Sequence, residues 1–205
     1  MTRRERRVAG KTPTPSKAAQ PNPAAIPASV PYLPAPDPAR VQAWEERLGP
    51  HDRLRVGLVW SGDPDPNNDH NPSVPLGILS DLLDLDATFV SLQKEPSADD
   101  RALLSRSEVI DLTDQLTDFA ETSALVSCLD LVISVDTSVA HLAGALGRPV
   151  WTLLPHTPDY REMLERDDSP WYPTMRLFRQ SASRSHAEVI ARVRGELCAL
   201  IAKRG

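Results

Sequence analysis

Apolar residues in this chain form short continuous runs that alternate with segments of helical spacing. Continuous runs, as opposed to strict alternation, indicate parallel strands that are covered on both faces. The runs predict strands at 54–60, 87–93, 109–112, 131–135, 150–154 and 175–179. The remaining periodic segments predict helices at 38–48, 76–83, 98–105, 119–129, 138–146 and 185–203.

This alternation predicts an α/β fold, with a doubly wound, mostly parallel, Rossmann-like sheet in the strand order 3-2-1-4-5-6. In such a sheet, ligands bind outside the carboxyl ends of the strands, where the winding reverses between strands 1 and 4. The loops at 61–74 and 136–141 are therefore expected to face each other across one crevice.

The amino-terminal residues differ in composition from the rest. Nine of the 20 prolines lie between Pro13 and Pro38. Such a stretch buries too little apolar surface to order itself, so we expect residues 1–30 to be a disordered tail. Residues 31–205 are expected to form one domain. Its first helix has Asp37 as N-cap and Gly49 after its end.

Charge and cysteine usage exclude several classes of protein. The first 20 residues carry six basic side chains and one acidic one, a net charge of +5. Because the net charge of the whole chain is −5, the other residues carry −10. An acidic body argues against a nucleic-acid-binding domain. No apolar run reaches the length of a membrane span, and no secretory signal is present. The two cysteines form no metal-binding or disulfide pattern, which favours a cytoplasmic protein without a metal.

The segment 131–149 (LVISVDTSVAHLAGALGRP) is the most informative part of the chain. A β-branched strand ends at Asp136, and Thr137, Ser138 and His141 open a helix. The free N–H groups and the positive dipole end of such a helix favour an anion such as phosphate, to which His141 adds a donor. The alternative is structural: Asp136 acts only as the N-cap and accepts a hydrogen bond from the backbone of the first turn.

Several cofactor motifs are absent. The loop after the first strand lacks GxGxxG, which disfavours NAD and FAD. No GxxxxGK[ST] motif is present, which disfavours a P-loop ATPase. No GxSxG motif is present, so a small hydrolase that uses His141 and an acid is disfavoured as well.

Four segments carry a family resemblance: VGLVWSGDP (56–64), FVSLQK (89–94), the stretch 129–155 and RDDSPWYPTMRLFRQ (166–180). Together with the lead-in at 31–49, they resemble the carboxy-terminal part of bacterial tetratricopeptide-repeat glycosyltransferase-like proteins. Those proteins are similar to the heptosyltransferases of glycosyltransferase family 9 and, more distantly, to O-GlcNAc transferases. The resemblance implies the second half of a GT-B fold, which binds the nucleotide-sugar donor as substrate.

The resemblance also implies where the donor lies. It puts the donor diphosphate at Asp136, Thr137, Ser138 and His141, with the nucleotide near Gln93 and Lys94 and with Ser61 and Gly62 across the cleft. For Lys94 the alternative is a solvated lysine. Trp171 and Tyr172 are expected to cover the edge of the sheet, and stacking on a base is their alternative role.

The sequence departs from the family pattern at three places. His70 and Pro72 stand where relatives carry arginines, so a permanently charged phosphate ligand is replaced by one that is charged only when protonated. An acid, Glu162, replaces an aromatic residue. The first GT-B domain, which binds the acceptor and supplies the base in the resembling enzymes, is absent from the 205 residues. No catalytic residue is therefore assigned.

Two hypotheses follow from these observations. The first is the donor-binding half of a glycosyltransferase, inactive or weakly active alone, with a separate tetratricopeptide-repeat or acceptor-domain protein as partner. The second is a non-catalytic module of the same fold that binds a nucleotide or a protein.

Overall fold

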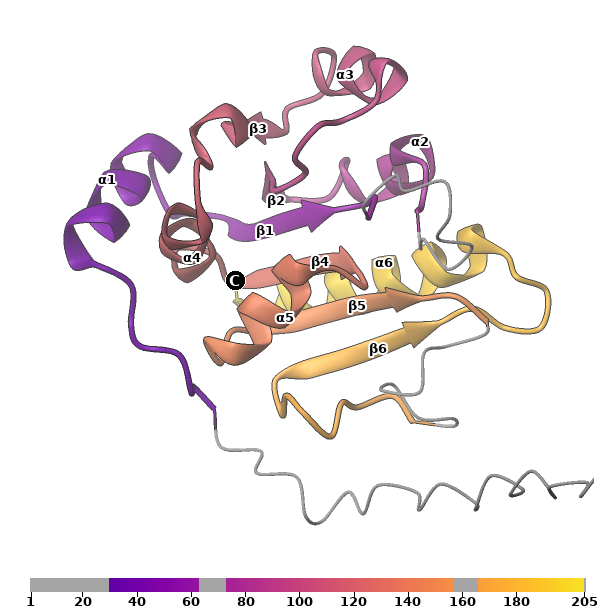
Figure 1. Ribbon diagram of the computed structural model, residues 1–205. Helices are drawn as coiled ribbons and strands as arrows, with labels where there is room; N and C mark the ends of the chain where they lie inside the picture. Colours follow the sequence, from indigo (N-terminus) through magenta and orange to yellow (C-terminus); the bar gives the residue numbers. More distant parts are fainter. Residues whose placement is uncertain (1–29, 63–72, 157–165, 205) are drawn as a thin grey trace, which may run out of the picture.

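A computed structural model describes residues 30–62, 73–156 and 166–204. Its centre is a six-stranded sheet in the order β3-β2-β1-β4-β5-β6, in which every neighbouring pair is parallel (Figure 1). The predicted fold class and strand order are confirmed. The strands are β1 (Leu54–Val59), β2 (Ala87–Ser91), β3 (Ile110–Asp111), β4 (Leu131–Val135), β5 (Val150–Leu154) and β6 (Met175–Arg179).

Helices cover both faces of this sheet. They are α1 (Pro38–Leu48), α2 (Leu76–Leu79), α3 (Ala98–Leu104), α4 (Phe119–Ser127), α5 (Ser138–Ala145) and α6 (His186–Arg204), with short 3-10 turns η2 (Ser80–Leu82) and η3 (Thr113–Gln115). Figure 1 shows α5 in front of the sheet and α6 behind it. One apolar cluster joins the sheet to α1, α4 and α5, and a second joins it to α2, α3 and α6.

The central strand β1 is buried along its whole length. It sends Val56 and Leu58 into the α6 cluster and Val59 into the α5 cluster, as a strand covered on both faces must. At Gly57, an added Cβ would lie 2.6 Å from Leu129 Cδ1 and 2.7 Å from Leu92 Cδ1. Glycine at this position therefore allows two leucine side chains to pack directly on the strand.

The predicted helix at 76–83 is present, but its second half is a 3-10 helix. The α-helix stops at Leu79 and continues as the 3-10 turn η2. Ser80 Oγ donates to the carbonyl of Gly77 at 2.6 Å. A serine that bonds to the backbone of the preceding turn, together with a glycine in that turn, weakens a regular helix. The other element boundaries lie within two residues of the predicted ones.

Polar contacts define the start of α1 and hold the helix against the amino end of β1. Asp37 caps α1 as predicted, because its carboxylate accepts from Ala39 N at 3.0 Å. Arg55, fully buried at the start of β1, pairs with Glu45 of α1 and donates to the carbonyl of Gly49 at 2.7 Å. The segment before the first strand is thereby part of the domain.

Both cysteines are free thiols. Burial, followed by the carboxylate of Glu45, raises the pKa of the Cys128 thiol to about 12, so this cysteine is an inert core residue. Within the described ranges, none of the helices combines the length and the apolar character that crossing a bilayer requires.

Asp130, in the turn before β4, holds three segments at the amino edge of the sheet. One carboxylate oxygen accepts from Arg55 N at 2.9 Å, lies 2.8 Å from His51 Nε2 and pairs with Arg204 at the end of α6. Burial alone would raise the pKa of Asp130, but the bonds from Arg55, His51 and Arg204 outweigh it, and the pKa is lowered.

We predict that Asp130→Asn lowers the free energy of unfolding at pH 7 by about 1–3 kcal/mol, because hydrogen bonds to a charged group are weakened. The native pKa is depressed, so this stabilisation is complete above the unfolded value of about 3.9 and disappears as the pH falls through the native pKa. Urea unfolding of both proteins at pH 7 and below pH 4 measures the difference. Asp86→Asn, at a carboxylate with 79% exposure, is the control and should change little. Equal stability of Asp130→Asn and the native chain at pH 7 would contradict the prediction.

Candidate functional site

The loops that follow β1 and β4 lie at neighbouring positions on one edge of the sheet. The two strands pair in parallel, with Val59 opposite Ser134. Asp136 follows directly after β4, and Ser61 stands two residues after the end of β1. The strand order also places the winding reversal between these strands, so this is the edge where ligands bind in doubly wound sheets.

The amino terminus of α5, whose first-turn N–H groups have no acceptor within the helix, lies at this edge. The N-cap is Thr137, so the interpretation of Asp136 as N-cap is wrong. The side chain of Thr137 makes no capping hydrogen bond, and its Oγ1 lies 3.0 Å from the buried Ser134 Oγ. Because Ser134 donates its single proton to the carbonyl of Val135, Thr137 is the donor in this pair. The hydroxyl of Thr137 therefore donates its hydrogen bond toward the interior, whereas Ser138 is exposed at the surface.

His141 lies one turn into α5 and is oriented by Asp136. Its Nε2 is 3.1 Å from Asp136 Oδ1. A carboxylate only accepts hydrogen bonds, so Nε2 carries the proton, and Nδ1 is the nitrogen left for a ligand. The side chains are 30% and 17% exposed for His141 and Asp136. The two residues therefore form a partly buried pair at the start of α5.

On the β1 side, Gln93 builds the loop that carries Ser61 and Gly62. The carboxamide oxygen of the buried Gln93 accepts from Trp60 N at 3.1 Å and from Ser61 N at 2.8 Å. Its Nε2 donates to the carbonyl of Lys94 at 3.0 Å. Ser61 Oγ lies 3.0 Å from Ser73 Oγ and donates to the carbonyl of Gly62. Gln93 thus ties the end of β1 to the end of β2.

Lys94 is exposed in the turn after β2. The next residue, Glu95, has a φ of 54°, which few residues other than glycine adopt. Because β1 and β2 pair in parallel, Lys94 lies at the same edge of the sheet as Ser61. His70, the other basic candidate, lies outside the described residues, as do Pro72 and Glu162.

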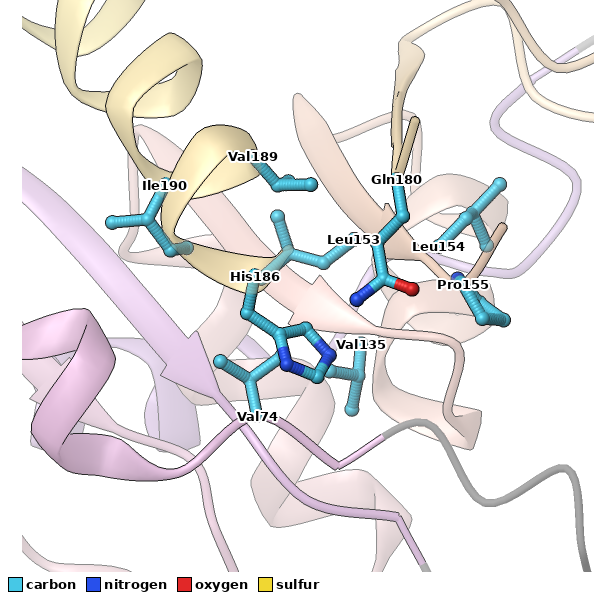
Figure 2. Close-up of a pocket in the computed structure, with 9 residues that line it drawn as sticks. All are labelled: Val74, Val135, Leu153, Leu154, Pro155, Gln180, His186, Val189 and Ile190. Carbon is cyan, nitrogen blue, oxygen red and sulfur yellow. The ribbon is translucent and has the colours of Figure 1, made fainter. Parts of the chain in front are cut away.

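A second feature of this edge was not predicted from the sequence. A small cavity of about 20 Å³, enough for about one water, lies on the α6 side of the sheet. Figure 2 shows the residues that line it. Gln180, at the end of β6, repeats the role of Gln93, because its Oε1 accepts from His156 N at 3.2 Å and its Nε2 donates to the carbonyl of Arg184. In the sequence, the shared role is signalled by a glutamine close after a strand: Gln180 follows β6 directly, and Gln93 stands two residues after the end of β2. The cavity is lined by Val74, Val135, Leu153, Leu154, Pro155, Gln180, His186, Val189 and Ile190.

Across residues 30–62, 73–156 and 166–204, histidine, cysteine and acidic side chains do not gather in groups of three that could hold a metal ion. The groups at the starts of these loops that suit anion binding are backbone N–H groups, hydroxyl groups, the imidazole of His141 and the ammonium of Lys94.

Comparison with known proteins gives a family for part of the chain. Residues 102–187, which include β4, α5 and the Asp136–His141 pair, match the model of glycosyltransferase family 9 (heptosyltransferase). Protein FlbA of Caulobacter vibrioides (strain ATCC 19089 / CIP 103742 / CB 15) is 32% identical over 155 residues, which are 70% of this chain and 25% of FlbA.

Two solved structures share the fold. The ADP-heptose LPS heptosyltransferase II of E. coli has a TM-score of 0.55 at 18% identity, over 84% of this chain and 56% of that one. A family 9 glycosyl transferase from Veillonella parvula DSM 2008 has a TM-score of 0.55 at 14% identity, over 81% and 50%.

The match therefore spans a quarter of FlbA and about half of each solved structure. The chain contains a segment that matches glycosyltransferase family 9, in a domain with the α/β fold of the heptosyltransferase structures.

Proposed function

We propose that this chain is the donor-binding half of a glycosyltransferase-like protein and that the diphosphate of a nucleotide sugar binds at the start of α5. The observation that carries the proposal is the Asp136–His141 pair at the amino terminus of α5, where the winding of the sheet reverses. The family 9 match includes this segment, which supports a nucleotide-sugar donor as the ligand.

Each site residue has a distinct proposed role. The first-turn N–H groups of α5 and the hydroxyl of Ser138 bind phosphate oxygens. His141 donates from Nδ1, which requires the imidazolium form because Nε2 is held by Asp136. Lys94 supplies a permanent charge beside the nucleotide. Gln93 fixes the loop after β1 and Thr137 fixes the loop after β4, each through hydrogen bonds with neighbouring residues.

The β1 loop forms the opposite wall of the proposed site. Ser61 and Gly62 face the diphosphate there, and the hydrogen bonds from Gln93 hold the start of this loop in place. His70 belongs to the same loop and is proposed as a further phosphate ligand by its position in the family pattern.

We predict that His141→Ala weakens binding of a nucleoside diphosphate by about 1–3 kcal/mol, the value of a hydrogen bond to a charged group. Isothermal titration with UDP, GDP and ADP measures the difference. His186→Ala, in the α6-side cavity, is the matched control. Unchanged affinity in His141→Ala would place the ligand elsewhere.

Transfer of a sugar needs more than this one domain. Catalysis requires an acceptor in near-attack geometry and a base within hydrogen-bond reach. The described residues form one Rossmann-like domain, and the matched region covers about half of the solved relatives. We therefore propose that an acceptor-binding domain outside these 205 residues completes the site, with a tetratricopeptide-repeat or acceptor-domain protein as the candidate partner.

The purified 205-residue chain is predicted to show slow sugar-nucleotide hydrolysis at most and no transfer. The physical reasons are the missing acceptor wall and weak charge stabilisation of the departing diphosphate. The measurement is product formation with a panel of sugar nucleotides and peptide or lipid acceptors. Robust transfer by the chain alone would show that this domain carries its own base and would overturn the prediction.

A second candidate is a non-catalytic nucleotide- or protein-binding module. The observation that favours it is the scarcity of positive charge: of the predicted site residues within the described ranges, only Lys94 is permanently cationic. Stabilisation of charge in the transition state is usually the largest catalytic contribution. Nucleotide binding without hydrolysis or transfer, even with an acceptor-domain partner present, would support this candidate.

A further inference from the structure

The proposed donor site does not use the motif Ser169–Pro173, although this motif is among the specific segments of the sequence. Its Tyr172 is half-buried and packs on α5 beside His141. The two ring centroids are 5.6 Å apart, and the rings are tilted by 52°. Tyr172 therefore covers the helix that carries the candidate site, and it is not displayed as a platform for a base.

The surface of α5 is shaped for this ring. An added Cβ at Gly144 would lie 2.6 Å from Tyr172 Cγ and 2.8 Å from its Cδ1. Any other residue at position 144 would displace the tyrosine. Glycine in a helix interior costs about 1 kcal/mol relative to alanine. The close approach of Tyr172 gives that glycine a packing role.

A second aromatic residue holds Tyr172 from outside. Tyr32 stacks on it with centroids 6.3 Å apart and an interplanar angle of 24°, and the two hydroxyl oxygens are 3.3 Å apart. Tyr32 is itself fixed to the end of α5, because its backbone N–H donates to the carbonyl of Ala145 at 3.1 Å. The segment by which the chain enters the domain thus braces the ring beside His141.

We propose that Tyr172 is a positioning residue that fixes the imidazole of His141 for the ligand. His141 is held at Nε2 by Asp136, and its ring packs beside Tyr172. Rotation about the Cβ–Cγ bond exchanges the positions of Nδ1 and Cδ2 and removes Nε2 from Asp136. A ring that rotates in this way loses the carboxylate that selects the Nε2-protonated tautomer. The aromatic contact opposes this rotation, so Nδ1 keeps one direction. The claim that Nδ1 faces a diphosphate rests on the proposed function. The claim that Tyr172 positions the imidazole does not.

The direct test is the tautomer of His141 in the ligand-free full chain, measured by long-range ¹H–¹⁵N NMR of the imidazoles at pH 8 and assigned with His141→Gln. We expect the native chain and Tyr172→Phe to show neutral His141 protonated at Nε2. Tyr172→Leu, which removes the ring, is expected to show a mixture of both tautomers. Gly144→Ala displaces the ring without changing it, and should give the same mixture if Tyr172→Leu fails to fold.

A second measurement separates positioning from function. For whichever of UDP, GDP or ADP the native chain binds, affinity should fall about twofold to tenfold in Tyr172→Leu and stay native in Tyr172→Phe. If none of the three binds, the proposed function fails while the tautomer measurement still decides the role of Tyr172. Folded Tyr172→Leu and Gly144→Ala proteins with the native tautomer of His141 would overturn the proposal, and so would a native His141 that is not protonated at Nε2.

Discussion

β1 is buried between two parallel neighbours, and this burial determines where every other element must lie. Parallel strands need both faces covered, so helices pack in front of and behind the sheet. The backbone groups in the sheet are satisfied by the strand pairs, which leaves the loops after the strands as the place where polar groups remain open. The reversal of winding between β1 and β4 brings two of these loops to adjacent positions. The position of the candidate site is thus a consequence of the topology.

At that edge, buried side chains set up the exposed donors. Gln93 holds the loop after β1 because its carboxamide oxygen accepts hydrogen bonds from two backbone N–H groups. Beneath the start of α5, Ser134 accepts a hydrogen bond from the hydroxyl of Thr137. Asp136 fixes the protonated nitrogen of His141. The resulting arrangement suits an anion that accepts several hydrogen bonds, and it carries little positive charge. It therefore supports ligand binding more strongly than it supports transfer chemistry.

The fold could be predicted from the sequence because continuous apolar runs such as 131–135 have one interpretation in an alternating α/β pattern. The helix at 76–83 could not be predicted in full, because a local bond from Ser80 to Gly77 replaces the regular turn. The segment 136–141 could be singled out from its residue types, but the N-cap at Thr137 and the Asp136–His141 bond depend on side-chain directions. The placement of Tyr172 depends on tertiary packing between segments that are far apart in the sequence, so periodicity carries no signal for it.

The central claim is that an anionic nucleotide binds at the start of α5. The most direct measurement is a backbone ¹H–¹⁵N NMR titration of the full chain with UDP, GDP and ADP, because amide signals report contact at individual residues. The account predicts that the largest saturable changes fall on the first-turn amides Ser138, Val139 and Ala140 and on Ser61 across the edge. Changes confined to the α6-side cavity, or no saturable change with any of the three nucleotides, would contradict it.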